Sequence, residues 1–198
     1  MLRVALQHLI DFLFPPQCGG CGRIGTGACE RCMPRDPAMT FALGTLHVTA
    51  LGAYAGRLRR AVLALKTGRR DVAKTFAQRL SEIVRAGEVL APVPTTRARR
   101  RERGFDGCEL LAGIVAQRTG AAVVHGLVQT AGDRQRGRNR DARLAAHGRF
   151  AWRGNRLDGV RVTLLDDVVT TGATLEDCAA TLRGCGAIVE RAIVVAKA

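Results

Sequence analysis

The chain has 198 residues, a length that allows one ordinary domain with a small addition or one somewhat large domain. Of these residues 47% are hydrophobic and 24% charged, as in a typical globular protein. Aromatic residues make up only 4%, so a core must be built from Ala, Val and Leu. The best apolar stretch, 160–169, is interrupted by charged residues and is too short to span a bilayer. These features exclude wholesale disorder and predict no insertion into a membrane.

The formal net charge of +14 comes almost entirely from arginine, because Lys66, Lys74 and Lys197 are the only lysines among 31 basic residues. Guanidinium groups bind phosphates through paired hydrogen bonds, and a field this positive attracts polyanions of any kind. An Arg-rich composition can equally reflect codon usage. Charge alone therefore predicts a polyanionic partner without identifying it.

The stretch ahead of the paired prolines 15–16 is apolar on one helical face. Leu and Ile recur at helical spacing over 2–13, whereas Gln7, His8 and Asp11 interrupt the apolar run that a secretion signal needs. The odd number of cysteines, seven, also argues against a disulfide framework. We therefore expect a short amphipathic helix that docks on the body of a cytoplasmic protein.

Four of the cysteines form two pairs, Cys18-x2-Cys21 and Cys29-x2-Cys32. Two thiolates at this spacing can approach one metal ion from a tight turn, and two such turns complete a tetrahedral zinc site. Free or redox-active thiols are the alternative, but this segment has too few apolar residues for a core of its own and needs another source of stability. Because four thiolates leave no position for a substrate, we predict a structural zinc element.

The zinc element and the N-terminal helix together occupy residues 1–37, and the main domain is expected at 38–198. Strand patterns there cover 46–54, 89–93, 121–128, 160–165 and 187–195, and helix patterns cover 58–65, 72–84, 108–119 and 174–183. Two Arg-rich loops, 95–106 and 129–149, lie between them. Strands that alternate with helices predict an α/β fold with a parallel sheet. Ligands bind such sheets beyond the carboxyl ends of the strands, where these loops should converge.

The most informative segment is 162–174, in which an apolar strand leads into Asp166 and Asp167, then into a turn rich in Thr and Gly, and then into a helix. The backbone N–H groups of such a turn and the positive end of the helix can hold a phosphate. The carboxylates can accept hydrogen bonds from sugar hydroxyls or hold a hydrated magnesium ion. A ribose 5-phosphate fits both halves. The alternative is that Thr174 merely caps the helix and the aspartates end the strand.

The sequence LLDDVVTTGAT at 164–174 resembles the phosphoribosyl pyrophosphate signature of type I phosphoribosyltransferases. Other segments resemble the ComF family in particular. These are LIDFLFPPQCGGCG, YAGRLRRAVLALK ending at Lys66, and Pro92-Val93-Pro94 followed by Arg103-Gly104-Phe105. The resemblance covers nearly the whole chain and implies a type I phosphoribosyltransferase-like parallel sheet flanked by helices, preceded by a small zinc-binding element.

The resemblance also implies roles for individual residues. Asp166 and Asp167 would be the catalytic pair on the ribose hydroxyls, and the loop after them would hold the 5-phosphate. The loop from Val93 to Arg103 would hold the pyrophosphate, and 129–158 would cover the site. The implied substrate-binding residues are Lys66, Val93, Pro94, Arg97, Arg103, Gly104, Val168, Val169, Thr170, Thr171, Gly172, Ala173 and Thr174.

Two departures from the family pattern are visible. Asp106 stands where the family usually has Asn, which places a negative charge beside the implied pyrophosphate loop. The region around Gln135 and Arg143 matches the corresponding family segment only loosely.

Three functions agree with these residues. The first is a phosphoribosyltransferase, in which magnesium and arginines stabilise the departing pyrophosphate. The second is a non-catalytic module that binds phosphoribosyl pyrophosphate or another nucleotide as a signal. The third is a single-stranded DNA-binding protein, which the ComF resemblance implies through competence and DNA uptake, although few aromatic residues are present for stacking on bases. We expect a phosphoribosyltransferase-fold protein that binds phosphoribosyl pyrophosphate with magnesium.

Overall fold

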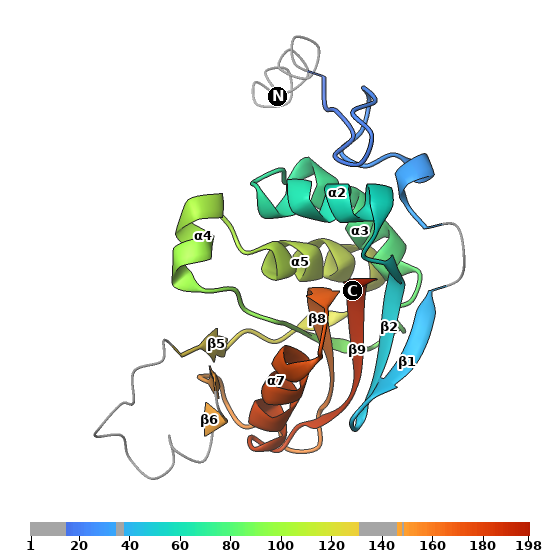
Figure 1. Ribbon diagram of the computed structural model, residues 1–198. Helices are drawn as coiled ribbons and strands as arrows, with labels where there is room; N and C mark the ends of the chain where they lie inside the picture. Colours follow the sequence, from blue (N-terminus) through green and yellow to red (C-terminus); the bar gives the residue numbers. More distant parts are fainter. Residues whose placement is uncertain (1–14, 35–37, 131–145, 148) are drawn as a thin grey trace.

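The computed structural model describes residues 15–34, 38–130, 146–147 and 149–198, and it confirms a mixed α/β fold. The main sheet has six strands (Figure 1). In spatial order they are β1 (Met39–Leu43), β2 (Leu46–Ala53), β9 (Ile188–Lys197), β8 (Arg161–Val169), β3 (Val89–Pro92) and β4 (Ala122–Val123). All neighbours pair in parallel except β1, which lies antiparallel to β2 at one edge. The helix expected at 2–13 lies outside the described residues.

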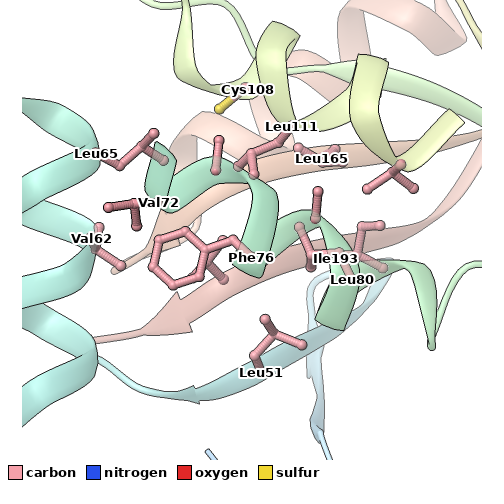
Figure 2. Packing of buried hydrophobic residues seen from close by; sticks show 14 of the residues in the cluster. Leu51, Val62, Leu65, Val72, Phe76, Leu80, Cys108, Leu111, Leu165 and Ile193 are labelled. Carbon is pink, nitrogen blue, oxygen red and sulfur yellow. The ribbon is translucent and has the colours of Figure 1, made fainter. Parts of the chain in front are cut away.

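Helices cover both faces of this sheet and enclose two hydrophobic cores. One face carries α2 (Gly56–Lys66), α3 (Asp71–Ser81) and α5 (Gly107–Thr119). The other face carries α7 (Ala173–Arg183) and a small antiparallel sheet of β5 (Leu127–Gln129), β7 (Phe150–Trp152) and β6 (Ala146–His147). Figure 2 shows the first core, in which Phe76 of α3 is completely buried among aliphatic side chains of α2, α5 and the strands.

The connections that follow β8 and β3 leave in opposite directions. After β8 the chain runs through α7 to β9, whereas after β3 it runs through α5, on the other face, to β4. Adjacent strands whose connections diverge in this way leave a crevice at their carboxyl ends, where ligands of open α/β sheets bind. The last β3 partner of β8 is Leu165, so the rest of β8 pairs only with β9. The end of β8 therefore borders this crevice.

Two expectations for the strands differ from the structure. The strand expected at 121–128 is divided between β4 and β5, which belong to different sheets. Gly126 separates them with a φ of 142°, a conformation that non-glycine residues rarely adopt and that turns the chain out of the main sheet. The aspartates expected beyond the end of a strand lie inside β8, which continues to Val169.

The loop expected at 95–106 contains a helix, α4 (Arg97–Arg103). The Thr96 hydroxyl accepts a hydrogen bond from the backbone N–H of Arg99 (3.2 Å), and Gly104 ends the helix with a left-handed φ of 75°. Arginine is a good helix former, but α4 has no buried residue. Hydrophobic periodicity therefore gave no sign of this helix.

Candidate functional site

The carboxylates of Asp166 and Asp167 lie in the part of β8 that borders the crevice. Asp166 is only 9% exposed, and its Oδ1 accepts hydrogen bonds from the backbone N–H of Asp167 (2.7 Å) and from Sγ of Cys108 (3.5 Å). Burial and the neighbouring Asp167 charge raise the pKa of Asp166 to about 7. A buried carboxyl group that titrates near neutrality is typical of functional sites.

Lys66 brings a positive charge to this pair. It is the last residue of α2, and its Nζ lies 2.9 Å from Oδ1 of Asp167. Both side chains are partly exposed, at 27% for Lys66 and 16% for Asp167, so a ligand can reach them. The structure thus places Lys66 beside the two aspartates, although they are 100 residues away along the chain.

The residues after β8 form the loop expected to bind phosphate. Gly172 is the N-cap of α7 and makes no side-chain cap, and the side-chain contact to the first turn is a long one, from the N–H of Ala173 to Oγ1 of Thr171 (3.5 Å). The alternative role of Thr174 as the helix cap is therefore wrong. Since the first N–H groups of a helix have no partner within it, an uncapped start leaves donors for an anion. Gly172 has a φ of 85°, and a Cβ there would lie 2.2 Å from Leu43 Cδ2, so only glycine fits.

Residues that follow β3 lie beside β8. The backbone N–H of Val93 donates to the Leu165 carbonyl (2.9 Å), and Pro94 has no N–H to donate. One oxygen of Asp106 accepts the N–H of Thr95 (2.9 Å), while its other oxygen accepts two N–H groups at the start of α5. The negative charge of Asp106 thus lies at a helix N-terminus, where it is stabilising, and it holds the loop after β3 in place.

The remaining implied residues, Arg97, Arg103 and Gly104, form no hydrogen bond or ion pair with the aspartates within the part of the chain that the structure describes. Arg97 is exposed on α4 and Arg103 is partly exposed. The carbonyl of Gly104 accepts a hydrogen bond from Arg70 Nη2 (2.9 Å). Most of the implied cover at 129–158, including 131–145, lies outside the described residues.

One cation at the loop was not singled out from the sequence. Arg149, just before β7, lies 3.0 Å through Nε from Oδ2 of Asp177 and 3.5 Å through Nη2 from Oγ1 of Thr174. Thr174 and Asp177 are three residues apart and share one face of α7. That spacing was visible in the sequence, but nothing in the sequence indicated which basic residue faces it.

The four paired cysteines meet at one point. Their sulfur atoms all lie within 4.8 Å of one another, and the Cys21–Cys29 and Cys29–Cys32 separations are 3.7 and 3.6 Å. Zn–S bonds of about 2.3 Å in a tetrahedron place sulfur atoms about 3.8 Å apart. The cluster therefore has the donor set and the dimensions to hold a metal ion such as zinc.

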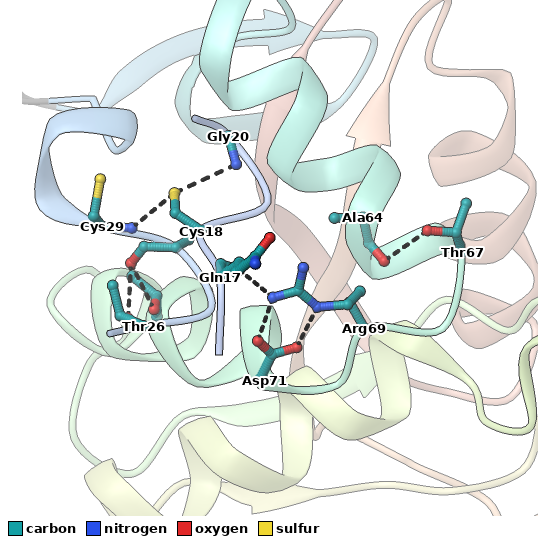
Figure 3. A network of polar contacts seen from close by, with 11 residues as sticks. Gln17, Cys18, Gly20, Thr26, Cys29, Ala64, Thr67, Arg69 and Asp71 are labelled. Carbon is teal, nitrogen blue, oxygen red and sulfur yellow. Dashed lines mark hydrogen bonds and ion pairs between the residues drawn. The ribbon is translucent and has the colours of Figure 1, made fainter. Parts of the chain in front are cut away.

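Backbone groups favour a thiolate in this cluster. Burial opposes ionisation of Cys18, but N–H groups of the surrounding turns, including those of Cys29 (3.3 Å) and Gly20 (3.4 Å), lower the pKa of Cys18 to about 6. Figure 3 shows these two contacts. Because a metal binds the thiolate form, this environment supports metal binding by Cys18, whereas burial and the neighbouring thiols raise the pKa of Cys32.

The cysteine segment packs tightly on α2 and α3. Arg60 Nε donates to the Gly20 carbonyl (2.7 Å). Figure 3 shows a second contact, in which Arg69 donates to the Gln17 carbonyl while it pairs with Asp71. A Cβ on Gly27 would lie 2.4 Å from the backbone of Asp71, so the backbones of the cysteine segment and of α3 are in direct contact. Ala28 and Met33 of this segment also join the core formed by α2, α3 and α5.

The curated proteins similar to this chain include a competence protein. Competence protein ComFC of Bacillus subtilis (strain 168) is 33% identical over 87 residues, which are 44% of this chain and 35% of that protein. The match is consistent with a ComF-family protein. It supports the resemblance found in the sequence motifs, at modest identity, and it spans about a third of the relative's length. No protein-family model matches the chain.

Solved structures similar to this chain include phosphoribosyltransferases. Adenine phosphoribosyltransferase from Leishmania tarentolae has a TM-score of 0.43 at 14% identity, with 80% of this chain and 94% of that chain covered. An allosteric regulatory enzyme of purine biosynthesis has a TM-score of 0.41 at 24% identity, with 65% and 25% covered. Among the described residues, no helix has the length and apolar character needed to cross a membrane.

Proposed function

We propose that this chain binds phosphoribosyl pyrophosphate or a related phosphorylated ribose in the crevice at the end of β8. One observation carries the proposal: Asp166 and Asp167 lie near the carboxyl end of β8, and the start of α7, at Gly172, follows five residues after Asp167. Carboxylates that accept sugar hydroxyls and N–H donors that bind a phosphate are thus separated by one short loop. The ComF-like motifs at the same positions agree with this ligand.

The roles of the other groups follow from their charges. Lys66, within 2.9 Å of Asp167, is close enough to bind an anionic part of the ligand as well as to balance the carboxylate. Magnesium binds proteins through one or two carboxylates together with substrate phosphates, and Asp167 is the partly exposed carboxylate that could contribute. We propose that transfer of the phosphoribosyl group, if an acceptor binds, takes place at this site.

We further propose that the four cysteines hold a structural zinc ion. Four thiolates complete its coordination, so the metal would stabilise the segment and take no part in the chemistry. Elemental analysis of protein purified without chelators should give about one zinc per chain. Protein that is folded and free of metal would contradict this assignment.

Calorimetric titration of the full chain with phosphoribosyl pyrophosphate, with and without magnesium, tests the ligand assignment. Binding that needs magnesium and weakens in Asp167→Asn is the expected result. Glu190→Gln is a matched control, since its carboxylate pairs with Arg161 on the surface, and it should bind as the wild type does. If the folded protein releases or absorbs no heat with this ligand, the proposal is wrong.

A second candidate ligand, single-stranded DNA, is favoured by α4. Five of its seven residues are arginines, and among the described residues none of these five forms an ion pair with a carboxylate. Unpaired arginines on an exposed helix can contact phosphates of any sequence. Because the Bacillus subtilis relative is a competence protein, we also propose a role in competence for this chain. Single-stranded DNA added as a competitor in the titration tests whether the two ligands share a site.

A further inference from the structure

Arg149 is held beside the proposed phosphate loop by a carboxylate of α7. Its Nε pairs with Oδ2 of Asp177 at 3.0 Å, and its side chain is 52% exposed. The same guanidinium lies 5.8 Å from the centre of the Phe150 ring. Phe150 is buried in the second core. The side chain is thus supported from two sides and remains open to solvent.

The rest of the guanidinium is available. Within the described residues, its only contact besides Asp177 and the ring is the one from Nη2 to Oγ1 of Thr174, which at 3.5 Å is long for a hydrogen bond. Nη1 has no partner there. A guanidinium carries five N–H donors in a fixed fork, so most of them can still bind an oxyanion without breaking the ion pair with Asp177.

The loop itself offers an anion only partial charges. The uncapped start of α7 contributes about half a positive charge, and a phosphate monoester carries nearly two negative charges near neutral pH. Among the described residues, Arg149 is the cation in contact with residues 170–174. A phosphate oxygen bound to the Thr174 hydroxyl would lie within reach of Nη2 of the same arginine.

We propose that Arg149 binds the 5-phosphate of the ligand and makes the site selective for a 5-phosphorylated ribose over an unphosphorylated one. This inference rests on the proposed function and adds a residue to it. Arg149 comes from the small sheet of β5, β7 and β6, whereas the loop comes from the main sheet. Phosphate binding would therefore join these two parts of the protein.

The test uses three probes with magnesium present: ribose 5-phosphate, phosphoribosyl pyrophosphate and inorganic pyrophosphate. The variant Arg149→Gln keeps most of the length of the side chain and its packing on Phe150 but removes the charge. Arg149→Lys keeps the charge without the fork. Arg153→Ala is the matched control, because Arg153 follows β7, is exposed and forms no side-chain hydrogen bond or ion pair within the described residues. Thermal melting verifies that each variant is folded.

We expect Arg149→Gln to lower the affinity for ribose 5-phosphate and for phosphoribosyl pyrophosphate by the same factor, about 10- to 100-fold, as for loss of a hydrogen bond to a charged group. The affinity of Arg149→Gln for pyrophosphate should change by less than about twofold. Arg149→Lys should recover part of the lost affinity for the two ribose ligands, and Arg153→Ala should bind all three probes as the wild type does. Unchanged binding of ribose 5-phosphate by Arg149→Gln would overturn the inference. So would an equal loss for all three probes, which would show a general effect of charge. If the wild type binds neither ribose ligand, the proposed function itself fails.

Discussion

Replacing Asp166 with Asn should make the protein more stable and its proposed ligand site weaker. The substitution keeps the shape of the side chain, and the Asn oxygen can still accept the N–H of Asp167 and the thiol of Cys108. It removes a carboxyl group that the fold holds in a buried position beside another negative charge. Stability and binding should therefore change in opposite directions.

The size of the stability change follows from the pKa of Asp166, which is about 7 in the folded protein and about 3.9 in an unfolded chain. Because the folded-state pKa is the higher one, the unfolded chain loses this proton first, and stability falls as the pH rises from about 4 to about 7. A shift of about three pKa units corresponds to on the order of 4 kcal/mol. Asn does not ionise, so the variant avoids this loss.

Urea unfolding of both proteins at pH 5 and pH 8 measures the effect. The unfolding free energies of the two proteins should differ little near pH 4. As the pH rises, Asp166→Asn should become more stable than the wild type, by up to about 4 kcal/mol at pH 8. Other titrating groups are common to both proteins and cancel in the difference. Binding of phosphoribosyl pyrophosphate at pH 8 should weaken by about 1.5–3 kcal/mol, as for a missing hydrogen bond to a charged group.

Asp167→Asn is the control for the stability change. Its carboxylate is paired with Lys66, so its removal leaves a lysine without a partner, but it also removes a charge that raises the pKa of Asp166. Its gain in stability at pH 8 should therefore be clearly smaller than that of Asp166→Asn. A stability difference between Asp166→Asn and the wild type that stays constant from pH 5 to pH 8 would refute the reasoning, because it would show that Asp166 ionises normally.

Three further predictions concern other parts of the molecule. Gly172→Ala should lower the unfolding free energy by about 1–2 kcal/mol from its left-handed backbone alone. Gly113 is exposed in α5 with open space around it, so Gly113→Ala should raise the unfolding free energy by about 0.5–1 kcal/mol. Urea unfolding of both variants measures the two changes. Cys29→Ser should lower the bound zinc and the melting temperature while leaving phosphoribosyl pyrophosphate binding in place, and weaker binding in the folded variant would count against a structural metal. Alanine at all three positions 99–101 should weaken the binding of single-stranded DNA of any sequence. The slope of log affinity against log salt concentration should become shallower by about 0.7 for each DNA phosphate that is no longer neutralised, and an unchanged slope would exclude α4 as the DNA surface.

The sequence predicted the elements that bury a regular apolar face. In α2 the buried residues Leu58, Ala61, Val62 and Leu65 follow helical spacing. The strands β8 and β9 contain short apolar runs between charged residues, and the run 192–196 of β9 is typical of a central parallel strand. The predicted order of strands and helices therefore led to the correct fold class. In contrast, α4 buries no side chain, and β1 is an edge strand with an exposed or half-exposed face, so neither left a hydrophobic signal.

The candidate site was predictable in part, for a similar reason. Asp166 and Asp167 stand next to the phosphate loop in the sequence, and local order revealed them together. The contacts of Lys66 with Asp167 and of Arg149 with Thr174 join segments that are far apart in the chain. Physical reasoning on a single sequence does not show which of many basic residues faces a given loop. Only the resemblance to known proteins indicated Lys66, and nothing indicated Arg149.

The tight contact between the cysteine segment and α2 and α3 affects how the protein can be divided. A chain trimmed to residues 38–198 would lose Ala28 and Met33 from the first core and would uncover the apolar sides of the two helices against which they pack. Arg60 and Arg69 would also lose the carbonyl groups that they bind. Exposed apolar patches of this kind promote self-association. The segment thus acts as a cover for the main domain, and the domain alone should be prone to aggregation even though every strand of its sheet is retained.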